Sequence, residues 1–324
     1  MNDLSAPSVS VILPILNEES DLENCITAIL QQDYDGELEV ILALGPSKDS
    51  TDLIAQKIAA KDKRVKLVKN PTGLTAAGLN LAIKASSFEI ICRIDGHAEI
   101  SKTYIKSAVS IMKETGAVNV GGIMFADSDQ GLQRTVAQAM RSKLGVGPSK
   151  FHTGGGAGES ETVYLGTFKK SAILAAGGFD ERFIRAQDWE LNYRIRKQGG
   201  LIWFDPRLVV TYRPRKTFSK LARQYFQYGR WRRVITRTHS NTSSLRYLAP
   251  PFAVVVNLFS LVSGVFVTPL LLLPLMVYIF TIVIGGFLIG RKITDKLLMP
   301  LVLATMHMSW GLGFITSPKN LLKG

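Results

Sequence analysis

Short apolar runs rich in β-branched residues alternate with longer stretches of mixed polarity along roughly the first 130 residues. Uninterrupted apolar runs of this kind are typical of strands that are buried on both faces. Strands are expected at 9–13, 39–44, 65–68, 90–94 and 118–125, and helices at roughly 19–32, 50–60, 74–86 and 101–115. The alternation predicts an α/β fold with a doubly wound, mostly parallel sheet.

The pattern changes after Arg246. No formal charge occurs in the 44 residues between Arg246 and Arg291, and a helix that spans a bilayer needs about 20 apolar residues. This run predicts two transmembrane helices at 249–267 and 270–289, and a second uncharged run predicts a third at 297–317. A buried helix pair in a soluble protein is the alternative, although soluble cores rarely lack charge over such a length.

The basic excess of the chain lies beside these helices. The formal net charge is +13, and residues 191–246 contain 14 Lys or Arg and one acid, Asp205. Such a patch suits nucleic acid, but its position next to apolar helices favours anionic lipid and the cytoplasmic side of a membrane. We therefore expect a multi-pass protein of the inner or plasma membrane with its polar domain in the cytoplasm, and no nucleic-acid partner. Two cysteines are too few for a disulfide scaffold, and we expect no secretory signal in the segment MNDLSAPSVSVILP.

Polar segments follow three of the expected strands, at 14–18, 43–52 and 95–97. Ligands of doubly wound sheets bind at the carboxyl ends of the strands. Asp95 and His97 both follow an apolar strand, and together they would reach a divalent ion that bridges the phosphates of a nucleotide. A turn with only a structural role is the alternative. The chain contains no P-loop motif.

Two further segments carry candidate chemistry. Asp188 and Glu190 begin a predicted helix that ends in basic residues. These acids either complement the helix dipole or, in the case of Asp188, take the proton from an attacking hydroxyl. In the segment 224–233, aromatic residues alternate with arginines. This pattern indicates either a juxtamembrane belt or a site where a sugar stacks on Trp231 and a diphosphate pairs with Arg230.

In this order, the segments resemble the inverting family 2 glycosyltransferases of the GT-A fold, and most closely a membrane-attached subgroup that includes succinoglycan-type glucosyltransferases. The likeness covers about residues 8–235 and extends to the C-terminal apolar helices. It implies a nucleotide-sugar donor, with UDP as the expected nucleotide, and a divalent metal cofactor. The resemblance rests on a P-x-x-N-E motif, a D-x-D metal motif in the form Asp95-Gly96-His97, and a Q-x-x-R-W motif.

The resemblance gives each candidate residue a role. The general base is Asp188, and the metal ligands are Asp95 and His97. The residues expected to bind the donor follow the first, second and fourth strands: Pro14, Asn17, Glu18, Ser47, Asp49 and Asp95. The residues expected to bind the acceptor lie further along the chain: Glu190, Gln227, Arg230 and Trp231.

Two positions depart from the family pattern. Leu44 stands where a donor-binding aspartate is expected, which leaves Ser47 and Asp49 to contact a UDP-sugar. His97 replaces the second metal-binding aspartate. Because imidazole accepts Mn²⁺ more readily than Mg²⁺, we expect a preference for Mn²⁺.

The expected function is transfer of a sugar to a hydroxyl of a polyprenyl-diphosphate-linked saccharide, in the synthesis of a cell-surface polysaccharide or exopolysaccharide. Three alternatives remain. One is a polyprenyl-phosphate glycosyltransferase, which would tolerate the loss of Asp188. The others are a processive polysaccharide synthase and a catalytically inactive membrane scaffold.

The expected domain organisation follows the same division. A cytoplasmic transferase domain would cover 1–235, with a nucleotide-binding half at about 1–125 and an acceptor half at about 126–235. A basic linker at 236–248 would lead to a membrane region at 249–317 with two to three transmembrane helices.

Overall fold

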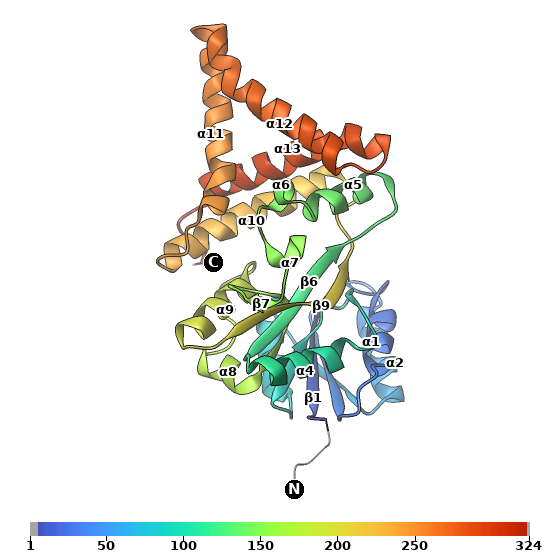
Figure 1. Cartoon of the computed structure of the whole chain (residues 1–324). Coiled ribbons are helices and arrows are strands. Elements are labelled where there is room, and N and C mark those ends of the chain that lie inside the picture. The colour runs from blue at the N-terminus through green and yellow to red at the C-terminus, as the bar shows by residue number, and fades with distance from the viewer. Residues whose placement is uncertain (1–5, 323–324) are drawn as a thin grey trace. The chain divides into compact units, whose positions relative to one another are not determined.

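The computed structural model describes residues 6–322, which fall into two compact units (Figure 1). The first unit contains residues 6–124 and 154–212, and the second contains 125–153 and 213–322. The expected end of the transferase domain at residue 235 therefore lies inside the second unit. Residues 125–153 and 213–235 belong with the C-terminal helices, for packing reasons given below.

The first unit is built on a nine-stranded sheet. Its strands are β1 (Val9–Ile15), β2 (Leu38–Leu44), β3 (Val65–Lys69), β4 (Ile90–Arg93), β5 (Glu99–Ile100), β6 (Asn119–Ala126), β7 (Gly158–Glu159), β8 (Tyr164–Lys169) and β9 (Ile202–Tyr212). They run in the order β3-β2-β1-β4-β8-β6-β9-β5, with β7 paired to β9. Strands β1 to β4 are mutually parallel, whereas β8 runs antiparallel to both β4 and β6. The mostly parallel sheet expected from the sequence is confirmed.

Helices cover both faces of this sheet. They are α1 (Leu22–Leu30), α2 (Thr51–Lys61), α3 (Thr75–Ala85), α4 (Tyr104–Thr115), α8 (Lys170–Ala175) and α9 (Gln187–Lys197). Alternate residues of β1, from Val9 to Ile15, share one core with buried residues of α1 and α4. On the opposite face α3 approaches closely, because Gly78 lies where a Cβ atom would be 3.4 Å from the Cβ atoms of Pro14 and Ala43.

The second unit is helical. It contains α5 (Gly131–Met140), α6 (Lys143–Val146), α7 (Lys150–Thr153), α10 (Phe218–Thr238), α11 (Leu245–Phe266), the 3-10 turn η1 (Pro269–Leu272), α12 (Leu273–Ile289) and α13 (Ile293–Ile315). Within residues 6–322, three helical segments are long and apolar enough to cross a membrane, at Leu245–Phe266, Pro269–Ile289 and Ile293–Ile315. Many large apolar side chains of α11 and α12 are exposed, which is the surface expected of helices that lie in lipid.

Helix α13 joins the apolar helices to the rest of the second unit. It packs along α10, and Figure 1 shows the two helices side by side. Gly229 of α10 lies directly on the backbone of Trp310, and Gly313 lies on the backbone of Phe226. At the start of α13, the buried Asp295 carboxylate accepts a hydrogen bond from Arg134 Nη2 of α5 at 2.8 Å. These contacts explain why α5 and α10 belong to the unit of the apolar helices.

Candidate active site

The carboxyl ends of β1 and β2 lie side by side, since Ile15 is the register partner of Leu44. The chain turns at Asn17, which adopts a left-handed conformation with φ 55°. Its backbone N–H donates to Ser47 Oγ at 3.1 Å, and its side-chain Oδ1 accepts from the Lys48 N–H at 2.8 Å. Asn17 and Ser47, both expected to bind the donor, therefore lie in contact with each other. Both side chains also hold the loops that follow the two strands.

Asp49 completes this edge. Its carboxylate accepts hydrogen bonds from the Thr51 hydroxyl at 2.5 Å and the Thr51 N–H at 3.1 Å. The Thr51 hydroxyl is the main reason why the pKa of Asp49 lies below its usual value. Pro14 is the residue before the last in β1, and it faces α3. Apart from Asp95, the residues expected to bind the donor thus share the edge formed by β1 and β2.

Strand β4 delivers a second set of side chains to the same edge of the sheet. Asp95 and His97 follow its last residue, Arg93, whose side chain is only 4% exposed. Arg93 Nη2 donates to Asp95 Oδ1 at 3.0 Å. His97 Nδ1 lies 2.9 Å from Oε1 of Glu18, which follows β1. This contact raises the pKa of His97 above its usual value.

Asp188 lies in the first turn of α9. The preceding Ala186 has φ 61°, a left-handed conformation that is strained for a residue with a Cβ atom and is often found at functional sites. The Asp188 carboxylate accepts a hydrogen bond from Arg93 Nη1. Burial raises the pKa of Asp188, the Arg93 charge opposes this increase, and Asp95 adds to it. One buried guanidinium therefore contacts both the expected metal ligand and the expected general base.

Arg93 is a residue that the sequence analysis did not identify. The sequence does contain an indication of its role, since Arg93 lies at the end of an otherwise apolar strand. A charge that is buried in a sheet needs partners of opposite charge. The sequence alone could not name those partners. One of them is 95 residues away along the chain.

Two residues expected to bind the acceptor are buried instead. Glu190 is 2% exposed, and its carboxylate pairs with Arg194 at 2.6 Å from Nη2 and 2.8 Å from Nε. Trp231 is also 2% exposed and belongs to the packed helices of the second unit. Their burial disfavours direct contact with a sugar in this conformation. Gln227 and Arg230, the other two expected residues, are half-buried on α10.

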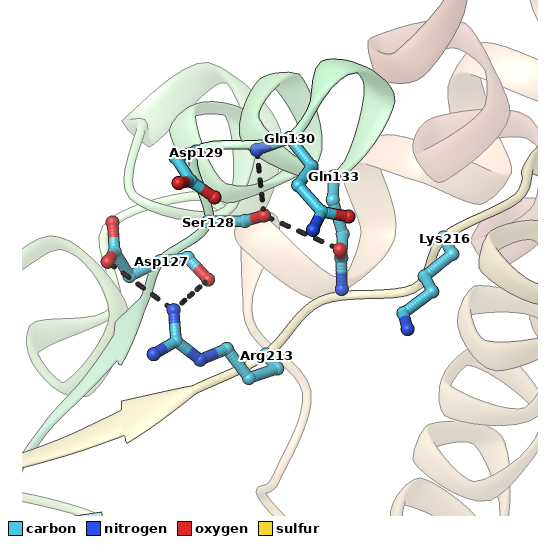
Figure 2. Close-up of a pocket in the computed structure, with 7 residues that line it drawn as sticks. All are labelled: Asp127, Ser128, Asp129, Gln130, Gln133, Arg213 and Lys216. Carbon is cyan, nitrogen blue, oxygen red and sulfur yellow. Dashed lines mark hydrogen bonds and ion pairs between the residues drawn. The ribbon is translucent and has the colours of Figure 1, made fainter.

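The second unit contains a polar pocket of about 530 Å³ (Figure 2). The residues that line it are Asp127, Ser128, Asp129, Gln130, Gln133, Arg213 and Lys216. Figure 2 shows Arg213 directed at Asp127, with Nη1 3.6 Å from the carboxylate, and Ser128 in contact with Gln130 and Gln133. The lining offers both donors and acceptors with balanced charge, which suits a ligand rich in hydroxyl groups. No sequence motif indicated this pocket.

The residues after β4 fit a divalent metal that is shared with a phosphate ligand. Among residues 6–322, no group of three or more His, Cys, Asp and Glu side chains is placed to hold a metal by itself. Metals of this kind are commonly held by one or two protein ligands together with substrate phosphates. Asp95 and His97 would supply those two ligands, and Nδ1 of the imidazole is already engaged by Glu18, which leaves Nε2 for a metal.

Comparisons with known proteins identify the family of the chain. Residues 10–173 match the family model described as glycosyl transferase family 2. The succinoglycan biosynthesis protein ExoA of Rhizobium meliloti is 30% identical over 97% of this chain and 96% of its own length. A Methanococcus voltae protein named as a glucuronosyltransferase that acts on dolichyl N-acetyl-α-D-glucosaminyl phosphate is 26% identical over 98% of both chains.

A solved structure supports the fold. The mannosyltransferase PcManGT of Pyrobaculum calidifontis, in complex with GDP-Man and Mn²⁺, matches with a TM-score of 0.61 at 18% identity. The match covers 97% of this chain and 88% of that one. The GT-A type of fold expected from the sequence is thereby confirmed.

Proposed function

The chain belongs to glycosyl transferase family 2 and is a glycosyltransferase, and from this premise we propose that it moves a sugar, with inversion, from a nucleotide-diphosphate donor to a hydroxyl of a lipid-linked saccharide. The observation that carries the proposal is the contact of Arg93 with both Asp95 and Asp188. Asp95, which suits a metal on the donor diphosphate, and Asp188, which suits the acceptor hydroxyl, therefore both contact the buried guanidinium of Arg93.

In the proposed reaction, Asp188 takes the proton from the acceptor hydroxyl. The hydroxyl oxygen attacks the anomeric carbon from the face opposite the nucleotide, and the new bond forms as the bond to the diphosphate breaks. The configuration is therefore inverted in one displacement. The charge of Arg93 opposes the increase in the pKa of Asp188, and its side chain contacts Asp95 as well. A divalent metal bound to Asp95 and His97 would offset the negative charge that develops on the departing diphosphate.

The proposed donor site is the edge formed by β1, β2 and β4. Asn17, Ser47 and Asp49 would contact the nucleotide there. The Asn17 N–H donates to Ser47 Oγ, Asn17 Oδ1 accepts from the Lys48 N–H, and the Asp49 carboxylate accepts from the Glu19 N–H, so these bonds hold the two loops together. A UDP-sugar remains the proposed donor. The solved relative holds GDP-Man, so GDP-sugars belong in any test.

Several features support an acceptor that is anchored in a membrane. The three apolar helices belong to the same unit as the polar pocket, Gln227 and Arg230. The pocket has polar groups of the kind that bind sugar hydroxyls, and the half-buried Arg230 would pair with a lipid diphosphate. The Methanococcus voltae relative is named for a lipid-linked sugar. We propose a multi-pass protein of the cell membrane with its sheet-containing unit in the cytoplasm, because the basic segment 191–246 leads into the apolar helices.

A label-transfer assay tests this function. Membranes that contain the chain or its Asp188→Asn variant would receive a panel of radiolabelled UDP- and GDP-sugars, and label would be counted in the organic-extractable fraction. Loss of a general base typically costs about 10²- to 10⁴-fold in rate, so the variant should transfer almost no label. Full activity of Asp188→Asn would instead support a lipid phosphate as acceptor, since a phosphate needs no base. No transfer from any donor would contradict the proposal.

A further inference from the structure

The side chain of Glu18 meets that of His97 across the turn after β4. Oε1 of Glu18 lies 2.9 Å from His97 Nδ1, the glutamate side chain is 17% exposed, and the imidazole is 45% exposed. Gly96 allows this approach, because a Cβ atom there would lie 3.1 Å from Glu18 Cγ and 2.8 Å from the side chain of Ile15. The loop after β1 and the turn after β4 are therefore fitted to each other at this contact.

We propose that Glu18 is a positioning residue for a metal ligand: its carboxylate accepts the Nδ1–H hydrogen bond of His97 and so directs the Nε2 lone pair toward the metal. The proposal rests on the function proposed above. In metal sites, a histidine ligand usually donates its other ring N–H to a carboxylate or carbonyl group, which fixes both the tautomer and the ring orientation. The 2.9 Å contact between Glu18 Oε1 and His97 Nδ1 fits this arrangement.

The backbone of Glu18 is held independently of its side chain. The Glu18 N–H donates to Thr51 Oγ1 at 2.8 Å, and the Glu18 carbonyl accepts from the Leu22 N–H at 2.9 Å. The main chain thus fixes the base of the side chain, and the carboxylate contributes to neither of these two bonds. A substitution of the carboxylate should consequently change the contact with His97 without loosening the loop.

The pair also explains how a histidine can serve where a carboxylate is expected. Either oxygen of an aspartate can bind a metal, so the side chain needs little orientation. An imidazole binds through one nitrogen, and that nitrogen must carry the lone pair. Glu18 therefore matters only while position 97 is a histidine, and this dependence separates the proposal from a direct contact between Glu18 and the donor nucleotide.

The experiment measures Mn²⁺ affinity rather than sugar transfer. The full chain in detergent would be titrated with Mn²⁺, alone and with excess UDP or GDP, and free Mn²⁺ would be read by electron paramagnetic resonance. Loss of such a carboxylate typically weakens metal affinity by about 10- to 100-fold, so Glu18→Gln should lower it by about tenfold or more. The matched control is Glu23→Gln, which replaces an exposed glutamate in the first turn of α1 and should bind Mn²⁺ as the unsubstituted chain does.

A second background makes the result decisive. In His97→Asp, the additional change Glu18→Gln should alter Mn²⁺ affinity by less than about twofold, because a carboxylate ligand needs no partner of this kind. Nitrogen-15 NMR of labelled histidines adds a readout that a purely structural role would not change. His97 should be protonated at Nδ1 in the unsubstituted chain and should lose this preference in Glu18→Gln.

Three results would overturn the inference: unchanged affinity in Glu18→Gln, an equal loss in the His97→Asp background, or no Mn²⁺ binding with either nucleotide. An equal loss in both backgrounds, together with weaker nucleotide binding in a chelator, would identify Glu18 as a direct donor contact. None of these readouts needs transfer activity. Failure of the proposed function would appear separately, as metal binding without label transfer.

Discussion

Replacement of Arg93 by methionine would test the electrostatic arrangement of the site. Methionine keeps an unbranched side chain in the buried position but removes the charge and the contacts with Asp95 and Asp188. Burial and Asp95 raise the pKa of Asp188, and Arg93 opposes them. Without Arg93 the pKa of Asp188 must rise further, so the proposed base stays protonated, and inactive, up to a higher pH.

The magnitude follows from the contact that is lost. A hydrogen bond to a charged group contributes about 1.5–3 kcal/mol, and each 1.4 kcal/mol or so is tenfold in an equilibrium. The Asp188 side chain is 29% exposed, so water screens part of the effect and the lower end applies. On the acidic side of the rate profile, kcat/KM should fall about tenfold in Arg93→Met. It should recover toward the unsubstituted value as the pH increases.

The assay is label transfer measured across pH for the unsubstituted chain, Arg93→Met and Arg182→Met. Arg182 is an exposed arginine that pairs with Asp180, and its variant should keep the original profile. Thermal unfolding in detergent would establish that each variant is folded. An acidic limb that does not move in folded Arg93→Met, or a loss that is the same at every pH, would refute the reasoning.

Three further predictions concern stability and metal preference. Burial raises the pKa of Glu39, but hydrogen bonds, chiefly from Lys66, lower it overall. The ionised carboxylate therefore stabilises the fold above the pKa of an unfolded glutamate, and this stabilisation is lost as the pH falls through the pKa of the folded state. Glu39→Gln should lower the free energy of unfolding by about 1–3 kcal/mol. Acid unfolding that is insensitive to this change would contradict the account. Gly229→Leu should lower the melting temperature by several degrees because its side chain would overlap the backbone of Trp310, whereas Gly156→Leu, in open space, should not; equal melting temperatures would argue against close packing of α10 on α13. With an imidazole among its ligands, the enzyme should transfer label faster with Mn²⁺ than with Mg²⁺, and equal or better activity with Mg²⁺ would count against that ligand set.

Much of the fold could be predicted from the sequence because its signals are local. The five expected strands match β1, β2, β3, β4 and β6 to within a residue or two at either end, since each is a mostly apolar run between polar turns. The three expected apolar helices are present as well. The third apolar helix begins at residue 293 rather than 297. Asp295 is buried against Arg134, so this charged residue lies inside the first turn of the helix.

The site could be predicted only in part. Asp95, His97 and Asp188 belong to motifs that are short in sequence. Because β1, β2 and β4 are parallel, the residues that follow β4 can be expected at the same edge of the sheet as those that follow β1 and β2. The role of Arg93 and the pairing of Glu18 with His97 depend on which loops meet across the sheet. The burial of Trp231 depends on how α10 packs within the second unit.

The sequence by itself determined the strands, the apolar helices and the family, and it led to the residues proposed for donor, metal and base. The tertiary structure alone decided which of those residues touch. It joined Asp95 and Asp188 through Arg93, and it moved residues 125–153 and α10 into the unit of the apolar helices. The physical reason is that periodicity and composition act over a few residues. An ion pair or a close helix contact depends on distance in space, which the sheet topology sets for segments nearly a hundred residues apart.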